Sequence, residues 1–240
     1  MTKKPIIGII PSFNLAGETN DPYQDVSFFV RMYSDAIVES GGIPIGILTE
    51  NIEDYLFLCD GYLWPGGNKI EKIFNRCIQD ALENNKPFLG ICLGAQALST
   101  YLTILEEQTH LKKTFLEIYQ ENKEKNPYLK RLNRGNLHGH YVTKDLESIN
   151  KAKHKVFIKK NSLLYSIYEQ EEISVVSLHE VAIARTSSKV VISGEAEDDV
   201  VQAIEYTRNG ASLLGVQWHP ELVKDRKVFD WLISTGKKEK

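Results

Sequence analysis

Cysteine is scarce in this chain of 240 residues, which contains only Cys59, Cys77 and Cys92. Three cysteines cannot form a fully paired disulfide framework. Secreted domains often depend on such frameworks, whereas unpaired thiols are typical of proteins in reducing compartments. The cysteine content therefore excludes a disulfide scaffold and favours a cytoplasmic location.

Long apolar runs are also missing. An uncharged, largely apolar stretch spans residues 87–103, and it contains Gln96 and several hydroxyl side chains. It falls short of the roughly 20 apolar residues that a membrane-spanning helix needs. Near the start, Lys3-Lys4 precedes only residues 6–10 before Pro11, which is too short a run for a signal peptide. We therefore expect no membrane partner.

A strong excess of either charge is absent as well. Lysine and arginine number 29 against 32 aspartates and glutamates, for a net charge of −3. Nucleic acids and anionic membranes attract basic surfaces, so neither is an expected partner. The hydrophobic content of 42% in 240 residues is enough for one large domain with a sizeable core.

Apolar runs alternate with helical patterns through the first hundred residues. This alternation predicts βαβ units, and hence an α/β fold with an open, mostly parallel sheet flanked by helices. A helix over residues 25–39 should end at Gly41-Gly42, before Pro44. A second helix, over about residues 70–84, carries Cys77 on its apolar stripe. The expected strands cover residues 6–10, 45–48, 61–64 and 88–92.

The pattern changes over residues 103–153, which are irregular, charged and rich in asparagine. We expect a divergent loop and helix excursion there, inside a single domain that covers residues 1–240. A last helix is expected over residues 221–234. Between the excursion and that helix, short β-rich runs cover residues 155–158, 174–177, 181–185, 190–193, 200–206 and 212–217.

The most informative segment is Phe88-Leu-Gly-Ile-Cys92-Leu-Gly-Ala-Gln96. A short apolar strand runs into Gly90-x-Cys92-x-Gly94 and then into a helix, the strand-turn-helix geometry that exposes a nucleophile. Glycines are needed on both sides because a Cβ would resist the sharp turn and keep the substrate away. The helix N-terminus favours a thiolate over a thiol. Cys92 is therefore the candidate nucleophile, whereas Cys77 and Cys59 lie in apolar patterns and are expected core residues.

A base and its carboxylate partner follow in Trp218-His219-Pro220-Glu221. This unit lies just past an expected strand, so that His219 could take a proton and Glu221 could orient its imidazole. His-Pro-Glu alone is more often a helix start, and Gly-x-Cys-x-Gly alone is more often a buried structural cysteine. Together with Pro65-Gly66-Gly67, both units lie at the carboxyl ends of strands, where open parallel sheets bind their ligands.

These segments together resemble the class I glutamine amidotransferases. Within that class the chain is most similar to the γ-glutamyl-γ-aminobutyrate hydrolases of the peptidase C26 group, which implies a flavodoxin-like fold. The likeness covers nearly the whole length and comes in the family's order. Besides the segments above, it includes Pro5-Ile-Ile-Gly-Ile, Tyr33-Ser-Asp-Ala-Ile37, Gly41-Gly-Ile-Pro44, Asp60-Gly-Tyr-Leu-Trp64, His154-x-Val-x-Ile158, Ser162-Leu163, Ser177-x-His179, Asp198-x-Val-Val-x-Ala-Ile204 and Gly215-Val-Gln217.

Some positions depart from the family pattern. Leu93 stands where many members have arginine, Ile104-Leu105 where a pair of glycines is usual, and Gln202 where a glutamate is common. The segment Val176-Ser177-Leu178-His179-Glu180 lacks the usual Asn-Ser-x-His-His pattern, and Ile70-Glu71 replaces an Arg-Asp pair. Core catalysis therefore looks intact, whereas substrate recognition looks altered.

The resemblance implies a cysteine hydrolase that cleaves the γ-glutamyl amide bond of a small amine or peptide and needs no cofactor. Cys92 would attack the carbonyl, His219 would protonate the leaving amine, and Glu221 would hold the imidazole, so that water finally cleaves a γ-glutamyl thioester. By resemblance, the oxyanion hole would consist of backbone N–H groups of Gly66, Gly67 and Leu93. The glutamyl α-groups would contact Gln96, Ser177, Leu178 and His179.

Other functions stay open. The chain could be a glutaminase subunit that supplies ammonia to a separate synthetase, or a non-catalytic member that binds a γ-glutamyl ligand or a protein. The intact Cys92, His219 and Glu221 argue against the non-catalytic alternative. Neither the leaving amine, whose contacts are expected in residues 103–153, nor the oligomeric state, a homodimer included, follows from the sequence.

The histidines suggest a further alternative, a metal site. His138-Gly-His140 and His154 are its best ligands among the six histidines, but their spacing lacks a matching cysteine or carboxylate motif. We therefore expect no metal. His138 and His140 are instead expected in a polar loop over the active site, and Asp198-Asp199 in a solvated turn.

Overall fold

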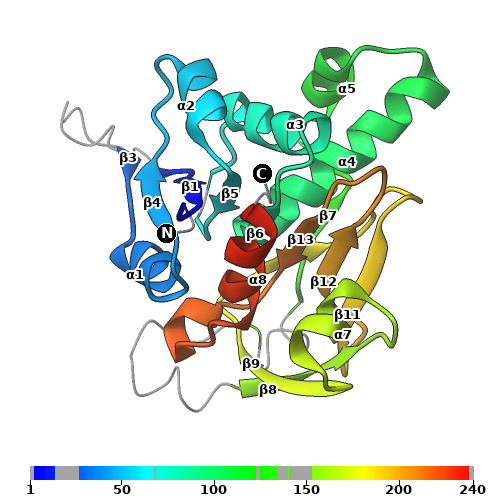
Figure 1. The fold of residues 1–240 in the computed structure, drawn as a ribbon. Helices are drawn as coiled ribbons and strands as arrows, with labels where there is room; N and C mark the ends of the chain where they lie inside the picture. Colours follow the sequence, from blue (N-terminus) through cyan, green and yellow to red (C-terminus); the bar gives the residue numbers. More distant parts are fainter. Residues whose placement is uncertain are drawn as a thin grey trace, which may run out of the picture.

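Nine strands form one sheet in the computed structural model, which describes residues 3–13, 27–67, 69–122, 125–133, 140 and 153–237 (Figure 1). In spatial order they are β4 (Ile43–Gly46), β1 (Ile6–Ile9), β5 (Gly61–Trp64), β6 (Phe88–Ile91), β13 (Leu213–Val216), β12 (Val201–Tyr206), β11 (Val191–Ala196), β8 (Lys153–Ile158) and β9 (Glu172–Val176).

The first five strands in this order are parallel, and the remaining four pair antiparallel. Since only β12 and β8 run against the others, seven of the nine strands point the same way. The parallel half, β4-β1-β5-β6-β13, has the flavodoxin-like order in which the first strand lies between the second and the third. The predicted fold class, an open and mostly parallel sheet flanked by helices, is confirmed.

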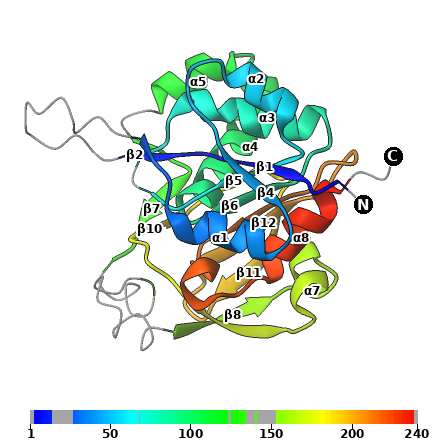
Figure 2. The same ribbon diagram turned by 60° about the vertical axis from the view of Figure 1, so that its left-hand side comes forward.

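Side chains of the parallel strands alternate between two apolar layers. In β6, Phe88 packs into one cluster of buried residues and Leu89 into the other. Helices α1 (Arg31–Glu39), α7 (Leu163–Tyr168) and α8 (Lys227–Gly236) cover one face. Helices α2 (Ile52–Leu58), α3 (Asn75–Glu83) and α4 (Leu93–Leu111) cover the other, and Figure 2 shows the two groups on opposite sides of the sheet. Because helices bury both faces, β5, β6 and β13 are buried at every position.

Several element boundaries differ from those predicted. The helix expected over residues 25–39 begins at Arg31, because Ser27–Phe28 forms β3, which pairs with β2 (Ser12–Phe13). The expected strand 45–48 begins two residues earlier, where Ile43 pairs with Ile6. The helix expected over residues 70–84 starts as the 3₁₀ turn η2 (Lys72–Phe74) before α3. Helices α2 and α7 were not predicted.

The last helix is split. Residues Pro220–Val223 form the 3₁₀ turn η3, which ends at Lys224 in a left-handed conformation with φ of 54°. Asp225 then accepts a hydrogen bond from the N–H of Lys227 at 3.1 Å, and α8 begins there. The prediction of a continuous helix over residues 221–234 is therefore wrong. None of the helices in the described part of the chain has the length and apolar character to span a bilayer.

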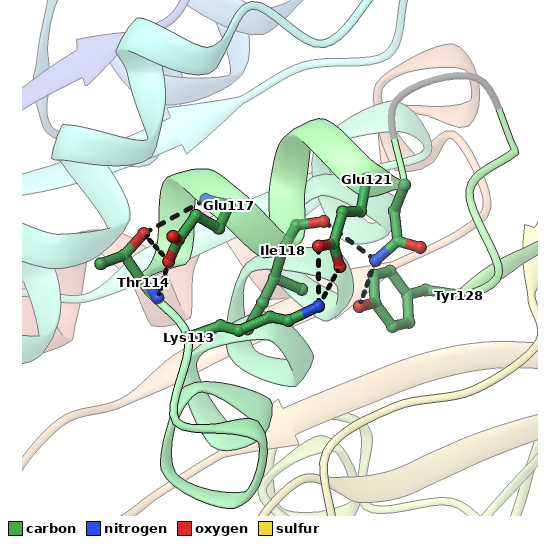
Figure 3. Close-up of polar contacts among 7 residues, drawn as sticks. Lys113, Thr114, Glu117, Ile118, Glu121 and Tyr128 are labelled. Atoms are coloured by element: carbon green, nitrogen blue, oxygen red, sulfur yellow. Dashed lines mark hydrogen bonds and ion pairs between the residues drawn. The ribbon is translucent and has the colours of Figure 1, made fainter.

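The expected excursion over residues 103–153 begins within α4. That helix ends at Leu111 and is followed by α5 (Phe115–Glu121), and Figure 3 shows the polar contacts at both ends of α5. Strand β7 (Leu129–Arg131) then pairs antiparallel with β10 (Val181–Ile183) in a small separate sheet. Residues 134–139 and 141–152, and His138 with them, lie outside the described residues.

Candidate active site

The predicted site residues gather at the carboxyl ends of β5, β6 and β13. These strands are neighbours in register, with Trp64 opposite Gly90 and Ile91 opposite Val216. The Pro65-Gly66-Gly67 loop leaves β5, Cys92 leaves β6, and Trp218-His219 follows β13. Three segments distant in sequence thus meet at one edge of the sheet.

Cys92 adopts the backbone conformation of a sharp elbow. Its φ of 50° and ψ of −102° are strained for a residue with a Cβ, at a cost of roughly 1–3 kcal/mol. Its N–H donates to the carbonyl of Val216 at 2.8 Å, and its carbonyl accepts from the N–H of Gln96 at 3.2 Å. A Cβ on Gly94 would lie 2.0 Å from the carbonyl oxygen of Trp64, so the elbow requires glycine there. The predicted strand-turn-helix geometry is therefore present.

His219 is held between Cys92 and Glu221. Its Nδ1 lies 2.6 Å from Oε1 of Glu221, and its backbone N–H donates to the carbonyl of Val176 at 2.8 Å. Since Nδ1 faces Glu221, Nε2 is the nitrogen left to bond the thiol of Cys92. Burial lowers the pKa of His219, but the charges of Glu221 and Cys92 and hydrogen bonds with both outweigh it, so the net pKa is raised well above 6.5. The imidazolium form is therefore favoured.

Gly66 touches the reacting side chains directly. A Cβ at this position would lie 2.6 Å from Cε1 of His219 and 3.5 Å from Cβ of Cys92. Its carbonyl accepts a hydrogen bond from the hydroxyl of Ser12 at 2.9 Å, which ties the loop to β2. Only a residue without a side chain lets the loop approach the imidazole this closely.

Tyr33 is a site residue that the sequence did not reveal. Its hydroxyl accepts a hydrogen bond from the N–H of Gly66 at 3.2 Å and lies 3.5 Å from Nδ1 of His219. Burial, together with the charge of Glu221, raises the pKa of Tyr33, so its hydroxyl keeps its proton. Tyr33 belongs to the apolar side of α1, and nothing in its local sequence separates a core tyrosine from one that faces a histidine.

The three predicted oxyanion donors differ in what surrounds their backbone N–H groups. The N–H of Gly66 already donates to Tyr33. A Cβ on Gly67 would lie 3.2 Å from the side chain of Leu93, so these two residues adjoin. Leu93 is the first residue of α4, where an N–H has no acceptor within its own helix. Gly67 and Leu93 therefore remain the better candidates of the three.

The predicted substrate residues lie beside this centre, largely in buried polar contacts. Nε2 of Gln96 donates to the carbonyl of Val181 at 2.8 Å and to Oε1 of Gln217 at 3.2 Å. The segment Ser177-Leu178-His179 follows β9, whose last residue, Val176, accepts the N–H of His219. The hydroxyl of Ser177 lies 2.8 Å from Nε2 of His154, and Leu178 is half-buried. The side chains of Gln96 and Ser177 are therefore already partnered.

Three histidines pack together behind Ser177. The ring of His140 lies 4.5 Å from that of His154 and 5.0 Å from that of His179 between centroids. Burial and the neighbouring His140 lower the pKa of His154 to about 4 and that of His179 to about 3. Among the described residues, no group of three His, Cys, Asp or Glu side chains is arranged to hold a metal ion.

His140 itself is buried and contacts Asp198, with Nε2 3.1 Å from Oδ2. Nδ1 of His140 lies 3.2 Å from Nε2 of Gln202. The expectation that His140 belongs to a polar loop over the site is therefore wrong, because its side chain is packed inside the molecule. Asp198 lies in a turn, as expected, but it pairs with this histidine.

The other two cysteines are core residues, as predicted. Cys59 and Cys77 are 2% and 0% exposed. Burial raises the pKa of Cys59 to about 12 and also raises that of Cys77. Neither thiol is ionised at neutral pH, so Cys92 is the only cysteine of the chain in a setting that suits a nucleophile.

Sequence comparison places this site in a family context. The pattern of the family described as peptidase C26 matches residues 72–221. The chain is 27% identical to the glutamine amidotransferase-like protein RP404 of Rickettsia prowazekii, over 99% of each chain. It is 25% identical to the glutamine amidotransferase-like protein YvdE of Lactococcus lactis, over 94% of each. It is also 26% identical to a CTP synthase of Methanosphaera stadtmanae, over 78% of this chain and 36% of that enzyme.

Solved structures share the fold. The glutaminase domain of Trypanosoma brucei CTPS with bound acivicin superposes with a TM-score of 0.64 at 17% identity, covering 98% of this chain and 95% of that one. A Thermoplasma acidophilum protein described as one of the GMP synthase subunits gives 0.63 at 14% identity, covering 98% and 94%. These two solved structures show only that this chain shares their fold. The family pattern covers the residues from η2 to Glu221.

Proposed function

The chain belongs to the peptidase C26 family, and from this premise we propose that it is a cysteine hydrolase that cleaves the γ-glutamyl amide bond of a small γ-glutamyl amine or peptide. The observation that carries the proposal is the meeting of Cys92, His219 and Glu221 at the elbow, with Gly66 packed against the imidazole. A thiol, a base and a carboxylate in this order form a nucleophilic triad.

In the first step the thiolate of Cys92 attacks the δ-carbonyl carbon of the substrate. A sulfur–carbon bond forms, and the carbonyl π electrons move to oxygen. As the tetrahedral intermediate collapses, the carbon–nitrogen bond breaks and the leaving nitrogen takes a proton from His219. The raised pKa of His219 keeps that proton available at neutral pH, since Glu221 stabilises the cation.

Water completes the cycle. His219, now neutral, accepts a proton from water as the oxygen attacks the γ-glutamyl thioester. Glutamate leaves with a new carbon–oxygen bond, and Cys92 leaves as a thiolate. No cofactor is needed, because the thiol, the imidazole and water supply every group that the reaction uses.

The oxyanion of each intermediate needs hydrogen-bond donors. We assign this role to the N–H groups of Leu93 and Gly67, each worth on the order of 3 kcal/mol in the transition state. Gly66 instead holds the loop in place through its bond to Tyr33. Tyr33 acts as a positioning residue, since its hydroxyl links this loop to the edge of the His219–Glu221 pair.

The glutamyl group would lie along the start of α4. Gln96, one turn after Cys92, and the backbone of Ser177 and Leu178 would hold its α-substituents, with His179 as the buried support of that segment. Three unpaired thiols suit a reducing compartment, so we place the protein in the cytoplasm.

A second candidate is a glutaminase that supplies ammonia to a separate synthetase. It is favoured by the CTP synthase relatives, of which this chain matches little more than a third, and by the glutaminase domain that shares its fold. A non-catalytic binding protein is a weaker alternative, because binding alone does not require the strained elbow at Cys92.

The experiment is a hydrolysis screen. Purified protein is incubated with glutamine and a panel of γ-glutamyl amines and peptides, and glutamate release is measured beside the Cys92→Ala variant. We expect release from at least one γ-glutamyl amide, faster than from glutamine, and a loss of at least about 10³-fold in the variant. Activity on glutamine alone, rising with a synthetase partner, would favour the second candidate. No release from any substrate would contradict both.

A further inference from the structure

The peptide group between Gly66 and Gly67 has a hydrogen-bond partner on one side only. Its carbonyl, that of Gly66, accepts a hydrogen bond from the hydroxyl of Ser12 at 2.9 Å. A trans peptide group is planar, so its C=O and its N–H point in opposite directions. The N–H of Gly67 therefore points away from Ser12, and it has no acceptor within the described part of the chain. This N–H is one of the donors that we assign to the oxyanion hole.

This peptide group has few constraints of its own. Both flanking residues are glycines, which have no Cβ to restrict its rotation. If the group turned over, its carbonyl oxygen would take the place of the N–H and would repel an oxyanion instead of binding it. Among the described residues, Ser12 is the only hydrogen-bond partner of this peptide group. The orientation with the N–H available therefore depends on the Ser12 hydroxyl.

Ser12 is itself held in a fixed position. The residue is buried, and it pairs with Phe28 across the ribbon formed by β2 and β3. Just before it, the N–H of Ile10 donates to the carbonyl of Leu63 at 2.9 Å, which ties this segment to the end of β5. Pro11 restricts the backbone between these two contacts. The hydroxyl therefore loses little conformational freedom when it bonds the loop, as a preorganised donor should.

The position of Gly67 supports its assignment as a donor. A Cβ on Gly67 would lie 3.7 Å from the hydroxyl oxygen of Ser12 and 3.2 Å from the side chain of Leu93. Gly67 thus adjoins both Ser12 and the first residue of α4. Because the N–H of Leu93 is the other donor that we assign to the oxyanion hole, both donors belong to neighbouring residues.

The peptide group on the other side of Gly66 has a different partner. The N–H of Gly66 donates to the hydroxyl of Tyr33 at 3.2 Å, and that hydroxyl lies 3.5 Å from Nδ1 of His219. Tyr33 therefore fixes the loop relative to the imidazole, whereas Ser12 fixes the direction of the N–H of Gly67. The two hydroxyls hold successive peptide groups of one loop and have separate effects.

We propose that Ser12 is a positioning residue that directs the N–H of Gly67 at the oxyanion. The inference rests on the proposed function and adds a residue to it. A hydrogen bond to the carbonyl also polarises the peptide group, which makes the N–H of Gly67 a stronger donor. Formation and hydrolysis of the thioester both pass through an oxyanion, so the Ser12 hydroxyl accelerates whichever step limits kcat.

The test measures hydrolysis of γ-glutamyl p-nitroanilide by the wild-type protein, Ser12→Ala and Ser12→Thr. Since the oxyanion forms only during the reaction, Ser12→Ala should lower kcat by about 10- to 100-fold and change KM by less than about threefold. Ser12→Thr keeps the hydroxyl and should keep at least about a third of the wild-type kcat.

Thr103→Val is the matched control. It also removes a buried hydroxyl that donates to a backbone carbonyl, that of Ser99, at 2.7 Å. Thr103 lies about three turns beyond Cys92 along α4, away from the loop. This variant should change kcat by less than about twofold, and melting temperatures check that every variant folds.

A second measurement separates positioning from general support of the fold. Alkylation of Cys92 by iodoacetamide requires a thiolate but forms no oxyanion, so Ser12→Ala should be alkylated at the wild-type rate. The pH profile of kcat/KM should also keep its shape, because Ser12 is not among the groups that perturb His219. A structural role would lower the alkylation rate and kcat together.

The outcomes separate this inference from the proposed function. The role of Ser12 alone would be overturned if Ser12→Ala kept more than about half of the wild-type kcat, or if Ser12→Ala and Ser12→Thr lost kcat equally. Parallel losses of kcat and of the alkylation rate in Ser12→Ala would overturn it as well. A wild-type protein that hydrolyses neither the anilide nor any substrate of the hydrolysis screen would overturn the proposed function, and this inference with it.

Discussion

Replacing Gly66 with alanine should slow catalysis strongly while the protein stays folded. The new methyl carbon would lie 2.6 Å from Cε1 of His219 and 3.5 Å from Cβ of Cys92. Nonbonded carbon atoms normally lie about 3.5–4.0 Å apart. The imidazole or the loop must therefore move by roughly 1 Å, and the ring is already held by its bond to Glu221 and by its own backbone.

A shift of this size is expected to cost about 10²-fold in kcat/KM, because the imidazole no longer lies in line with the thiol and the leaving nitrogen. This equals about 2.7 kcal/mol of transition-state stabilisation. The backbone of Gly66 is not left-handed, so alanine itself is tolerated there. Crowding should cost the fold about 1–3 kcal/mol, which a melting temperature measures.

Gly67→Ala is the matched control. Its methyl group would meet only the end of the Leu93 side chain at 3.2 Å and Ser12 at 3.7 Å, and the N–H that we assign to the oxyanion hole is kept. We expect less than about a tenfold change in kcat/KM for the best substrate of the hydrolysis screen. If Gly66→Ala retains a third of the wild-type activity, or if the two variants lose activity equally, the contact between the loop and the imidazole does not control catalysis.

Other predictions concern the thiol, the tyrosine, the histidines and metal ions. Iodoacetamide should modify Cys92 before the two core cysteines, as measured by peptide mass spectrometry. Labelling of a core cysteine first would contradict the assignment. Tyr33→Phe should lower kcat more than it changes KM and should shift the pH profile of kcat, whereas a purely structural role would lower only the melting temperature. The pKa values of His154 and His179 are lowered in the folded protein, so the unfolded chain binds more protons and the free energy of unfolding should fall as the pH drops from about 6.5 towards 4. Chemical denaturation of a His154→Gln variant should show a weaker pH dependence of this free energy, by up to about 3 kcal/mol. Activity should survive EDTA, and a loss that added zinc restores would point to a metal site.

Most of the parallel half of the fold could be predicted from the sequence. Strands β5 and β6 are continuous apolar runs bounded by turn residues, a pattern that buried parallel strands share. The predicted ends of strands and helices were wrong where contacts with residues distant in the sequence determine them. The early start of β4 follows from its pairing with β1, and the split before α8 follows from a left-handed Lys224, a residue type that gives no warning of a turn.

The candidate site also contains residues that local motifs indicate and residues that only the packing of distant segments reveals. Cys92, His219 and Glu221 lie in short motifs whose residue types carry their chemistry, so the sequence indicates them. Tyr33 lies 186 residues from His219 in the sequence, and only the packing of α1 against η3, the turn that follows His219, brings them together. The partners of Gln96 are likewise invisible locally, because they come from β10 and from the residue that follows β13.

The most direct test of the central claim is to trap the thioester on Cys92. The protein is mixed with the best γ-glutamyl substrate, quenched in acid within the first turnover, and digested for mass spectrometry. We predict a peptide that contains Cys92 and is heavier by one acyl group of the substrate, which disappears on treatment with hydroxylamine and is absent from Cys92→Ala. Turnover of the substrate with no such adduct, or with the adduct on another residue, would contradict the account.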